Sequence, residues 1–471
     1  MVKAMDIKLR FLGAAQSVTG SCHFVEINGL KFLMDCGLYQ EREFLERNWN
    51  PFPVPPRTID AVLLTHAHID HCGLLPKLAR EGFGGPVYCT PATADISRIM
   101  LLDSAHIQEE DAAFKKRRHE REGRQGPYPE VPLYTVDEAK ACAQQFKPVD
   151  YGETVKVGSG VKATFHDAGH VFGSSMVTVQ VRQGGKRTLL FSGDIGRRNM
   201  PILRDPTVFD EADYVLVEST YGDRLHEDVG SIGSQLAEIV NSTVEAGGNI
   251  VIPSFALERS QALMYYLNKL LMSKRIPRLK VFIDSPLAAR ITEVFEKYPE
   301  LYDSELTSLI RQGKSPFDFL GLTMVKSVYE SKSINHIKGS VIIVAGSGMC
   351  TAGRIKHHLV ANIPRPESTI LFVGHQAAGT LGRHIVDGEG EVRILGQWYP
   401  VRARIVQING LSAHADKAEL FRWLSGLRRP PDHVFVVHGE NQVAHQFADF
   451  VRGERGWEVA VPAYRDEVVL E

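Results

Sequence analysis

The chain of 471 residues is long enough for two or three domains. Its 44% hydrophobic and 23% charged residues are ordinary for a globular protein, and its net charge of −2 argues against a uniformly basic nucleic-acid coat, although a local basic groove stays open. No membrane span, signal peptide, disulfide framework or zinc-finger spacing is visible in the sequence, so we expect a reduced, cytoplasmic protein.

The chain opens with predicted strands. Residues 7–12 have a strand pattern, and residues 22–27 and 30–35 flank Asn28-Gly29, a dipeptide that is typical of a tight hairpin turn. The last of these strands ends at Asp35. A carboxylate at a strand end near a metal-binding loop commonly orients a ligand histidine, and simple turn capping is the alternative.

The most informative stretch follows a short apolar run, residues 61–64, which predicts a buried strand. Directly after it come His66, His68, Asp70 and His71. In extended backbone His66 and His68 project on the same side, whereas the adjacent Asp70 and His71 diverge and suit a second metal beside the first. Three imidazoles and one carboxylate favour zinc, and the absence of a Cys-x-x-Cys pair indicates an open, hydrolytic site.

A highly charged stretch follows within a predicted helix, residues 103–126. Its residues 115–124 contain most of the charge, with Lys and Arg in excess. Such a run is more often a solvated helix face than a ridge that contacts phosphates, and both interpretations stay open.

Residues 155–190 return to the alternation of strands. His170 follows Gly169 and Asp194 follows Gly193, each at the exit of a predicted strand. A further apolar strand, residues 214–217, ends in Glu218. From the pattern alone, His170 and Asp194 are each as compatible with an ordinary turn as with a site.

Beyond about residue 222, predicted strands alternate with predicted helices, a pattern that indicates a small parallel sheet. Several strands of this region end in turns rich in Gly, Ser and Thr. Ligands bind at the carboxyl ends of strands in such sheets, and free backbone N–H groups suit phosphates. We therefore expect a track for a phosphate backbone at Ser347, Gly348, Met349, Gly379, Thr380 and Arg383.

The last part of the chain, from about residue 393, contains a predicted strand, residues 404–408, and then His414 in Ser-Ala-His-Ala-Asp. A predicted helix at residues 417–425 and a strand at residues 433–437 lead to His438, which is again followed by Gly. Two further histidines thus stand near the ends of strands.

Taken in order, these motifs resemble those of the β-CASP nucleases, the metallo-β-lactamase branch that includes ribonuclease J and the nuclease subunit of the cleavage and polyadenylation specificity factor. The resemblance covers nearly the whole chain. It implies an α/β fold: an αββα metallo-β-lactamase sandwich made of residues 1–221 and 393–471, interrupted by a parallel-sheet β-CASP domain, residues 222–392.

The resemblance also implies a role for each candidate residue. Two zinc ions are expected, with manganese open as a replacement, and Asp35 is expected behind the ligands. Glu218 would keep His414 protonated as the general acid, and Asp70 counts with them as catalytic. The implied ligands are His66, His68 and His170 for one ion, Asp70, His71 and His438 for the other, and Asp194 as the bridge.

These roles predict a zinc-dependent ribonuclease for RNA processing or decay. A hydroxide that bridges two zinc ions would attack a phosphodiester of single-stranded RNA and leave 5′-phosphate and 3′-hydroxyl ends. A slot between the domains is expected to exclude duplexes. The histidine at position 438 favours RNA, because the branch that cuts DNA tends to carry an aliphatic residue there.

Three alternatives are a DNA nuclease of the same family, a small-molecule metallo-hydrolase and a non-catalytic scaffold. The length is expected to leave no room for additional RNA-binding domains. The sequence leaves open the choice between endonuclease and 5′-exonuclease, the preferred RNA, and a homodimer.

Overall fold

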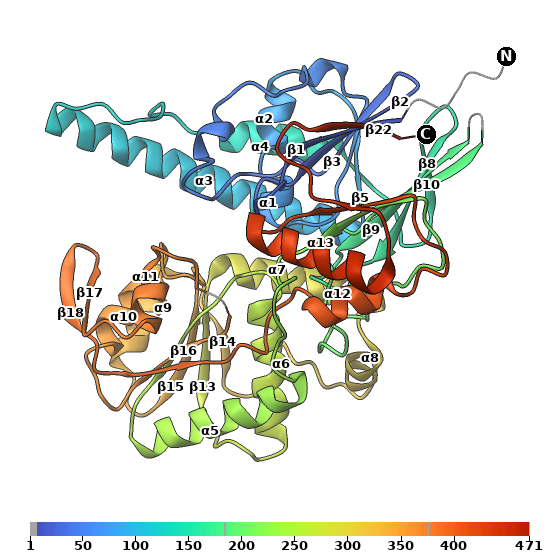
Figure 1. Cartoon of the computed structure of the whole chain (residues 1–471). Helices are drawn as coiled ribbons and strands as arrows, with labels where there is room; N and C mark the ends of the chain where they lie inside the picture. Colours follow the sequence, from blue (N-terminus) through green and yellow to red (C-terminus); the bar gives the residue numbers. More distant parts are fainter. Residues whose placement is uncertain (1–6, 183–184, 375, 471) are drawn as a thin grey trace. The chain divides into compact units, whose positions relative to one another are not determined.

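The structure, a computed structural model, describes residues 7–182, 185–374 and 376–470. The chain forms two compact units, which are described separately (Figure 1). Unit 1 consists of Met1–Arg198, Asp205–Leu225 and His414–Glu471, and unit 2 consists of Asn199–Arg204 and His226–Ala413.

Unit 1 contains two seven-stranded sheets. The first is antiparallel on one side and parallel on the other, with the order β22 (Glu467–Leu470), β1 (Ile7–Gly13), β2 (Cys22–Ile27), β3 (Leu30–Met34), β4 (Ala61–Leu63), β5 (Val87–Cys89), β6 (Phe146–Pro148). The second has the order β21 (Val459–Ala460), β20 (His433–Val437), β11 (Tyr214–Glu218), β10 (Lys186–Phe191), β9 (Ser175–Arg182), β8 (Val161–Asp167), β7 (Thr154–Gly158).

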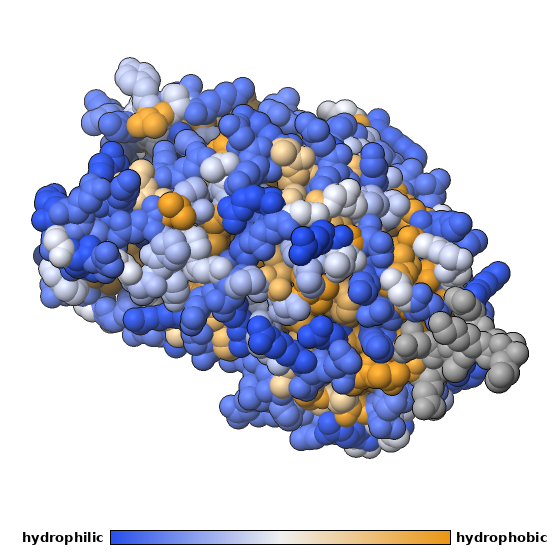
Figure 2. Space-filling model, turned by 90° about the horizontal axis from the view of Figure 1, so that it is seen from above, coloured by the Kyte–Doolittle hydropathy of each residue, from blue (hydrophilic) through white to orange (hydrophobic). Residues whose placement is uncertain are grey.

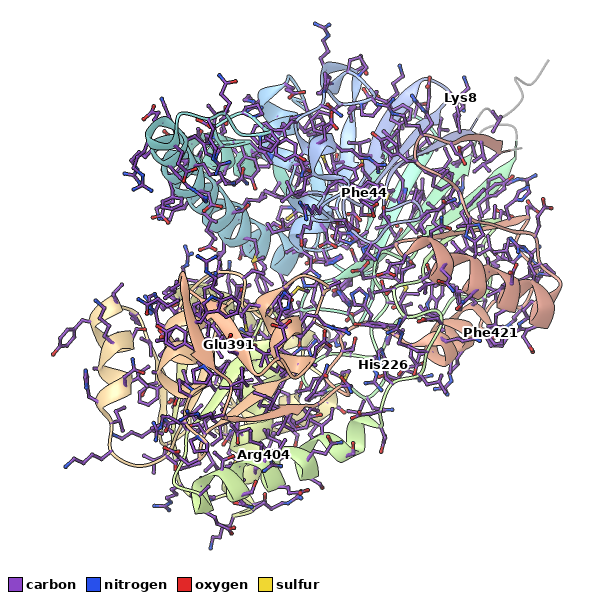
Figure 3. All side chains as sticks on the ribbon, turned by 60° about the vertical axis from the view of Figure 1, so that its left-hand side comes forward. Lys8, Phe44, His226, Glu391, Arg404 and Phe421 are labelled. Atoms are coloured by element: carbon purple, nitrogen blue, oxygen red, sulfur yellow. The ribbon has the colours of Figure 1, made fainter. Side chains whose placement is uncertain are left out.

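Helices cover the outer faces of both sheets. One apolar core, which includes Phe11 and Phe165, lies between the sheets. A second core joins the first sheet to α2 (Leu75–Arg80), α3 (Pro91–Glu122) and α4 (Val136–Cys142). A third joins the other sheet to α12 (Lys417–Leu424) and α13 (Asn441–Arg455), where the rings of Phe421, labelled in Figure 3, and Phe450 are 5.0 Å apart. These four layers confirm the expected αββα sandwich.

Unit 2 is built on a six-stranded sheet in which every strand pair is parallel. Its order is β14 (Leu322–Met324), β13 (Lys280–Asp284), β15 (Val341–Ala345), β12 (Ile250–Pro253), β16 (Thr369–Phe372), β19 (Arg404–Gln407). The expected parallel-sheet insertion is therefore confirmed.

Seven α-helices, three short 3₁₀ helices and a hairpin complete the described part of unit 2. Glu391 begins the hairpin and Arg404 begins β19 (Figure 3). The helices are α5 (Ile232–Glu245), α6 (Arg259–Met272), α7 (Pro286–Lys297), α8 (Ser304–Arg311), α9 (Val328–Ser333), α10 (Ile355–Asn362) and α11 (Leu381–Val386), and the hairpin pairs β17 (Glu391–Ile394) with β18 (Gln397–Pro400).

Two elements differ from the sequence-based expectation. Residues 393–413 lie in unit 2, because β19 pairs with β16 in the parallel sheet. Helix α3 begins at Pro91 instead of near residue 103, because the Thr90 side chain accepts a hydrogen bond from the Thr93 N–H and proline suits the first helical position. Within the described residues, no helix is long and apolar enough to cross a membrane.

Candidate metal centre

The candidate ligands meet in unit 1 at the ends of several strands. Residues 66–71 follow β4 and run into a single helical turn, α1 (Ile69–Cys72), which contains Asp70 and His71. The backbone is packed tightly here, since a Cβ on Gly37 would lie 1.6 Å from the carbonyl oxygen of Asp70. Only glycine permits this approach.

The first group consists of His66, His68, His170 and one oxygen of Asp194. Nε2 of His66 and Nε2 of His170 each lie 3.4 Å from Oδ2 of Asp194. Nδ1 of His68 is 3.0 Å from Nε2 of His66 and 3.3 Å from Nε2 of His170. Four ligand atoms from three separate segments therefore converge on one point.

The second group consists of Asp70, His71, His438 and the other oxygen of Asp194. Nε2 of His71 lies 3.0 Å from Nε2 of His438 and 3.3 Å from Oδ1 of Asp194. Nε2 of His438 lies 3.6 Å from both Oδ2 of Asp70 and Oδ1 of Asp194. Asp194 thus presents one carboxylate oxygen to each group.

These arrangements fit divalent metal ions. Tetrahedral zinc with Zn–N bonds of 2.0–2.1 Å separates two ligand nitrogens by about 3.3 Å, close to the spacings found here. The buried Oδ1 of Asp194 has no hydrogen-bond partner in the described part of the chain. Burial lowers the pKa of His66 and His170, and that of His68 to about 3, so these imidazoles are neutral, the form that binds metal.

Buried oxygens behind the ligands hold the second group in place. Oδ2 of Asp35 lies 2.7 Å from Nδ1 of His71, and the Asp35 carboxylate accepts hydrogen bonds from the N–H and hydroxyl of Thr65 at 2.8 and 2.9 Å. Burial opposes a charged His71, but Asp194 and Asp35 outweigh burial and raise its pKa well above the usual value.

Two threonines belong to the site although sequence reasoning missed them. The Thr65 hydroxyl lies 3.0 Å from Nδ1 of His66, and the Thr220 hydroxyl lies 3.1 Å from Nδ1 of His438. Each lies close in sequence to a candidate residue, since Thr65 directly precedes His66 and Thr220 lies two residues after Glu218. That proximity was the available signal.

The buried Glu218 and the partly exposed His414 form a pair beside the first group. Both carboxylate oxygens of Glu218 lie within 3.2 Å of Nδ1 of His414, and Nε2 of that ring lies 3.9 Å from Oδ2 of Asp194. The backbone N–H groups of Ile195 and Thr220 donate to the Glu218 carboxylate. Burial opposes a charged His414, but Glu218 and Asp194 outweigh it and raise its pKa to about 9.

The candidate phosphate-contacting residues lie in unit 2 in two loops. Ser347, Gly348 and Met349 follow β15, and Gly379 and Thr380 precede α11. A hydrogen bond from Gly382 N–H to the Met349 carbonyl, 3.2 Å, joins the loops. The Thr380 side chain caps α11, and Arg383 donates to Asp387 at 2.8 Å.

Three family models match this chain. They describe the metallo-β-lactamase superfamily over residues 17–227, a β-CASP domain over residues 260–385, and a Zn-dependent metallo-hydrolase RNA specificity domain over residues 398–462. With the fold and the histidine–aspartate cluster, they define a metallo-hydrolase of the metallo-β-lactamase class.

Curated relatives narrow the class. Ribonuclease TTHA0252 of Thermus thermophilus is 39% identical over 91% of this chain and 92% of that protein. Transcription termination factor FttA of Methanocaldococcus jannaschii is 32% identical over 95% of this chain and 69% of that protein. The chain belongs to the β-CASP family of the metallo-β-lactamase superfamily.

A solved structure agrees in fold. The crystal structure of a protein of unknown function from Enterococcus faecalis V583 superposes with a TM-score of 0.57 at 14% identity, over 99% of this chain and 100% of that one. That likeness concerns the fold alone. The family models and the ribonuclease relative together support a hydrolytic nuclease.

Proposed function

We propose that this protein is a two-zinc ribonuclease that hydrolyses phosphodiester bonds of single-stranded RNA and leaves 5′-phosphate and 3′-hydroxyl ends. The observation that carries the proposal is the Glu218–His414 pair, whose free Nε2 faces the metal cluster at Asp194. A centre that only stored metal would have no use for a protonated imidazole at its edge.

The pair has the properties of a general acid. Glu218 is fully buried, whereas the His414 side chain keeps 19% of its surface exposed, so a substrate can reach it. With a pKa of about 9, His414 is protonated at pH 7 and can donate the Nε2 proton to the leaving 3′-oxygen. Proton donation of this kind contributes roughly 10²–10⁴ in rate.

The remaining residues hold the metals and the strand. His66, His68 and His170 would hold one zinc and Asp70, His71 and His438 the other, with Asp194 between them. When bound there, the two ions supply positive charge for the scissile phosphate and lower the pKa of a water nucleophile. Asp35 fixes the ring of His71 from behind.

Support for RNA comes from the comparisons and from unit 2. One matched family model describes an RNA specificity domain, and one relative is named a ribonuclease. The loop that contains Ser347–Met349 follows strand β15 of the parallel sheet, and the loop that contains Gly379–Thr380 precedes helix α11. Both loops, together with Arg383, are proposed to contact RNA phosphates.

The first test offers the purified protein matched single-stranded RNA, duplex RNA and single-stranded DNA, each labelled internally, with and without a zinc chelator. We expect chelator-sensitive cutting of single-stranded RNA, and mass spectrometry of the fragments should find 5′-phosphates. Equal cutting of DNA would contradict the RNA assignment. Activity on small esters or amides without any on RNA would contradict the proposal as a whole.

The second test separates metal ligands from the acid. His414→Ala should retain both zinc ions by elemental analysis while kcat falls about 10²–10⁴-fold. His71→Ala and His438→Ala should each lose metal. His433→Ala is the matched control, because this exposed histidine begins the strand that ends before His438. Full zinc content in both ligand variants would overturn the ligand assignment.

A further inference from the structure

The distal half of α3 is not explained by the metal centre. A helix of 32 residues is about 48 Å long, and Figure 1 shows α3 projecting beyond the sheets of unit 1. We call residues 107–124 the α3 arm. Its helix ends at Glu122, and Gly123 forms a regular C-cap with a positive φ of 62° and an N–H bond to the His119 carbonyl.

One face of the arm is covered by its own chain. Ala105, Ala112 and His119, seven residues apart in turn, are buried. Residues 126–136 run back along this face, where Glu130 bonds to His119, and the Val136 N–H donates to Glu109 at 2.9 Å. The arm is therefore an ordered part of unit 1 and not a frayed end.

The opposite face combines aromatic and basic side chains in one stripe. Ile107, Phe114 and Arg121 are also seven residues apart, so they share a face on the side away from the buried one. Phe114 is 59% exposed and Ile107 is 48% exposed. Arg117 and Arg118 flank Phe114 on the same side, at the i+3 and i+4 positions.

Little of this positive charge is neutralised locally. Lys115, Arg117 and Arg121 are exposed and form no ion pair within the described residues, whereas Arg118 pairs with Glu122 at 2.8 Å. The side of the molecule on which α3 projects is mostly hydrophilic in Figure 2. More than half of the Phe114 side chain is thus open to a ligand among these cations.

We propose that the α3 arm binds single-stranded RNA outside the metal centre, with Phe114 stacking on a base and the surrounding arginines and lysines contacting phosphates. Single-strand binding proteins combine these two contacts, and stacking tolerates any base. The inference rests on the proposed ribonuclease function, since it makes the arm a tether for long substrates.

A second copy of the chain fits the arm less well. Two arms side by side would bring their arginines together, and an antiparallel pair would need acidic partners at residues 109–111. Glu109 already accepts from the Val136 N–H, and Glu110 lies 3.3 Å from His106. Asp111 and Glu120 are the two acidic side chains of the arm that form no pair within the described residues, against four such cations, Lys115, Lys116, Arg117 and Arg121. The excess of unpaired positive charge favours a polyanion.

The test compares two variants with a control in the full metal-loaded chain. The first reverses three cations (Lys115→Glu, Arg117→Glu, Arg121→Glu), and the second is Phe114→Ala. The control reverses three exposed cations elsewhere in unit 1 (Lys140→Glu, Lys147→Glu, Lys162→Glu), which changes the net charge equally. Each is combined with His414→Ala for binding measurements and kept separate for cleavage.

Fluorescence anisotropy with a labelled single-stranded RNA of roughly 30 nucleotides should show a Kd at least about tenfold higher for the charge-reversal variant, and a salt slope shallower by about 0.7 per lost phosphate contact. Phe114→Ala should raise the Kd roughly fivefold or more without changing the salt slope. The control should bind like the parent. Both arm variants should cleave an oligonucleotide of about six nucleotides with the kcat and KM of the parent, because so short a substrate is not expected to need the arm.

Unchanged RNA affinity in both variants would overturn the arm proposal. A sedimentation coefficient that is lower in the variants than in the parent would also overturn it, because it would show that the arm binds a second copy of the chain. If the parent protein cuts no RNA, the proposed function fails, but the anisotropy comparison still decides whether the arm binds RNA. The two failures are thus distinguishable.

Discussion

The two halves of the metal cluster are held by different chemistry. The half with His66, His68 and His170 is made of neutral imidazoles, because burial, together with repulsion from neighbouring histidines, lowers their pKa. The half with Asp70, His71 and His438 contains an additional carboxylate, and Asp35 stands directly behind His71. Both halves share Asp194.

The difference separates two ways of fixing a ligand. In the first half Nδ1 of His170 has no hydrogen-bond partner in the described residues, and Nδ1 of His66 lies 3.0 Å from the neutral hydroxyl of Thr65. In the second half the Asp35 carboxylate accepts a hydrogen bond from Nδ1 of His71, and the Thr220 hydroxyl lies 3.1 Å from Nδ1 of His438, so that both rings are oriented. Substitutions behind the ligands should therefore affect the second half more strongly than the first.

Removing the shared carboxylate should weaken metal binding in both halves of the cluster. Asp194→Ala deprives both groups of a ligand, so we expect both metals to be lost and activity to fall by more than about a hundredfold. Elemental analysis and RNA cleavage measure this. Asp210→Ala, at an exposed carboxylate, is the control. Retention of one full equivalent of zinc would show that Asp194 serves a single half.

Removing the carboxylate behind one half should weaken metal binding in that half alone. Asp35→Asn leaves every ligand in place but withdraws the negative charge behind His71, and we expect metal affinity to fall about 10–100-fold at one of two sites. Competition with a chromophoric chelator resolves the two sites. Asp60→Asn, which changes an exposed carboxylate near the same sheet, should bind like the parent. Equal weakening of both sites would refute the division.

Thr65 contacts both halves, so its effect should appear in stability. Thr65→Val preserves the shape but removes a hydroxyl that donates to Asp35, and we expect the free energy of unfolding of the metal-free protein to fall by about 1–3 kcal/mol. Urea denaturation measures it. Thr164→Val removes an exposed strand hydroxyl and should change stability by less than about 0.5 kcal/mol.

The smallest effect is expected at Thr220. Thr220→Val removes one hydroxyl from Nδ1 of His438, but the backbone N–H of His438 still bonds to the Ala14 carbonyl at 2.7 Å. Metal affinity of the second half should fall by no more than about tenfold in the same competition assay. A loss as large as that of Asp35→Asn would mean that the hydroxyl, not the carboxylate, orients this half.

Much of this site was predictable because ligand spacing is local. His66 to His71 lie in one short stretch, so strand and turn geometry alone placed them. The roles of His170, Asp194 and His438 required a resemblance, because the fold brings them together from far apart in the chain. The sequence also cannot show that His68 points Nδ1 toward the centre of its group, whereas His66 points Nε2, since rotamers depend on packing.

Threonines such as Thr65 and Thr220 are harder still to predict. A hydroxyl beside a strand end is common, and only its distance to a ring nitrogen distinguishes a functional one. The strand at residues 404–407 shows the same limit for the fold, because its pattern predicts a strand but not which sheet it joins.

The position of unit 2 in the chain has a consequence for biosynthesis. Glu218 precedes the insertion and His414 follows it, 196 residues later, while His438 comes later still. A nascent chain shorter than 438 residues thus has neither a complete second metal group nor, until residue 414, an acid. On the proposed function, a nascent chain therefore cannot form the complete centre before residue 438 has been synthesised.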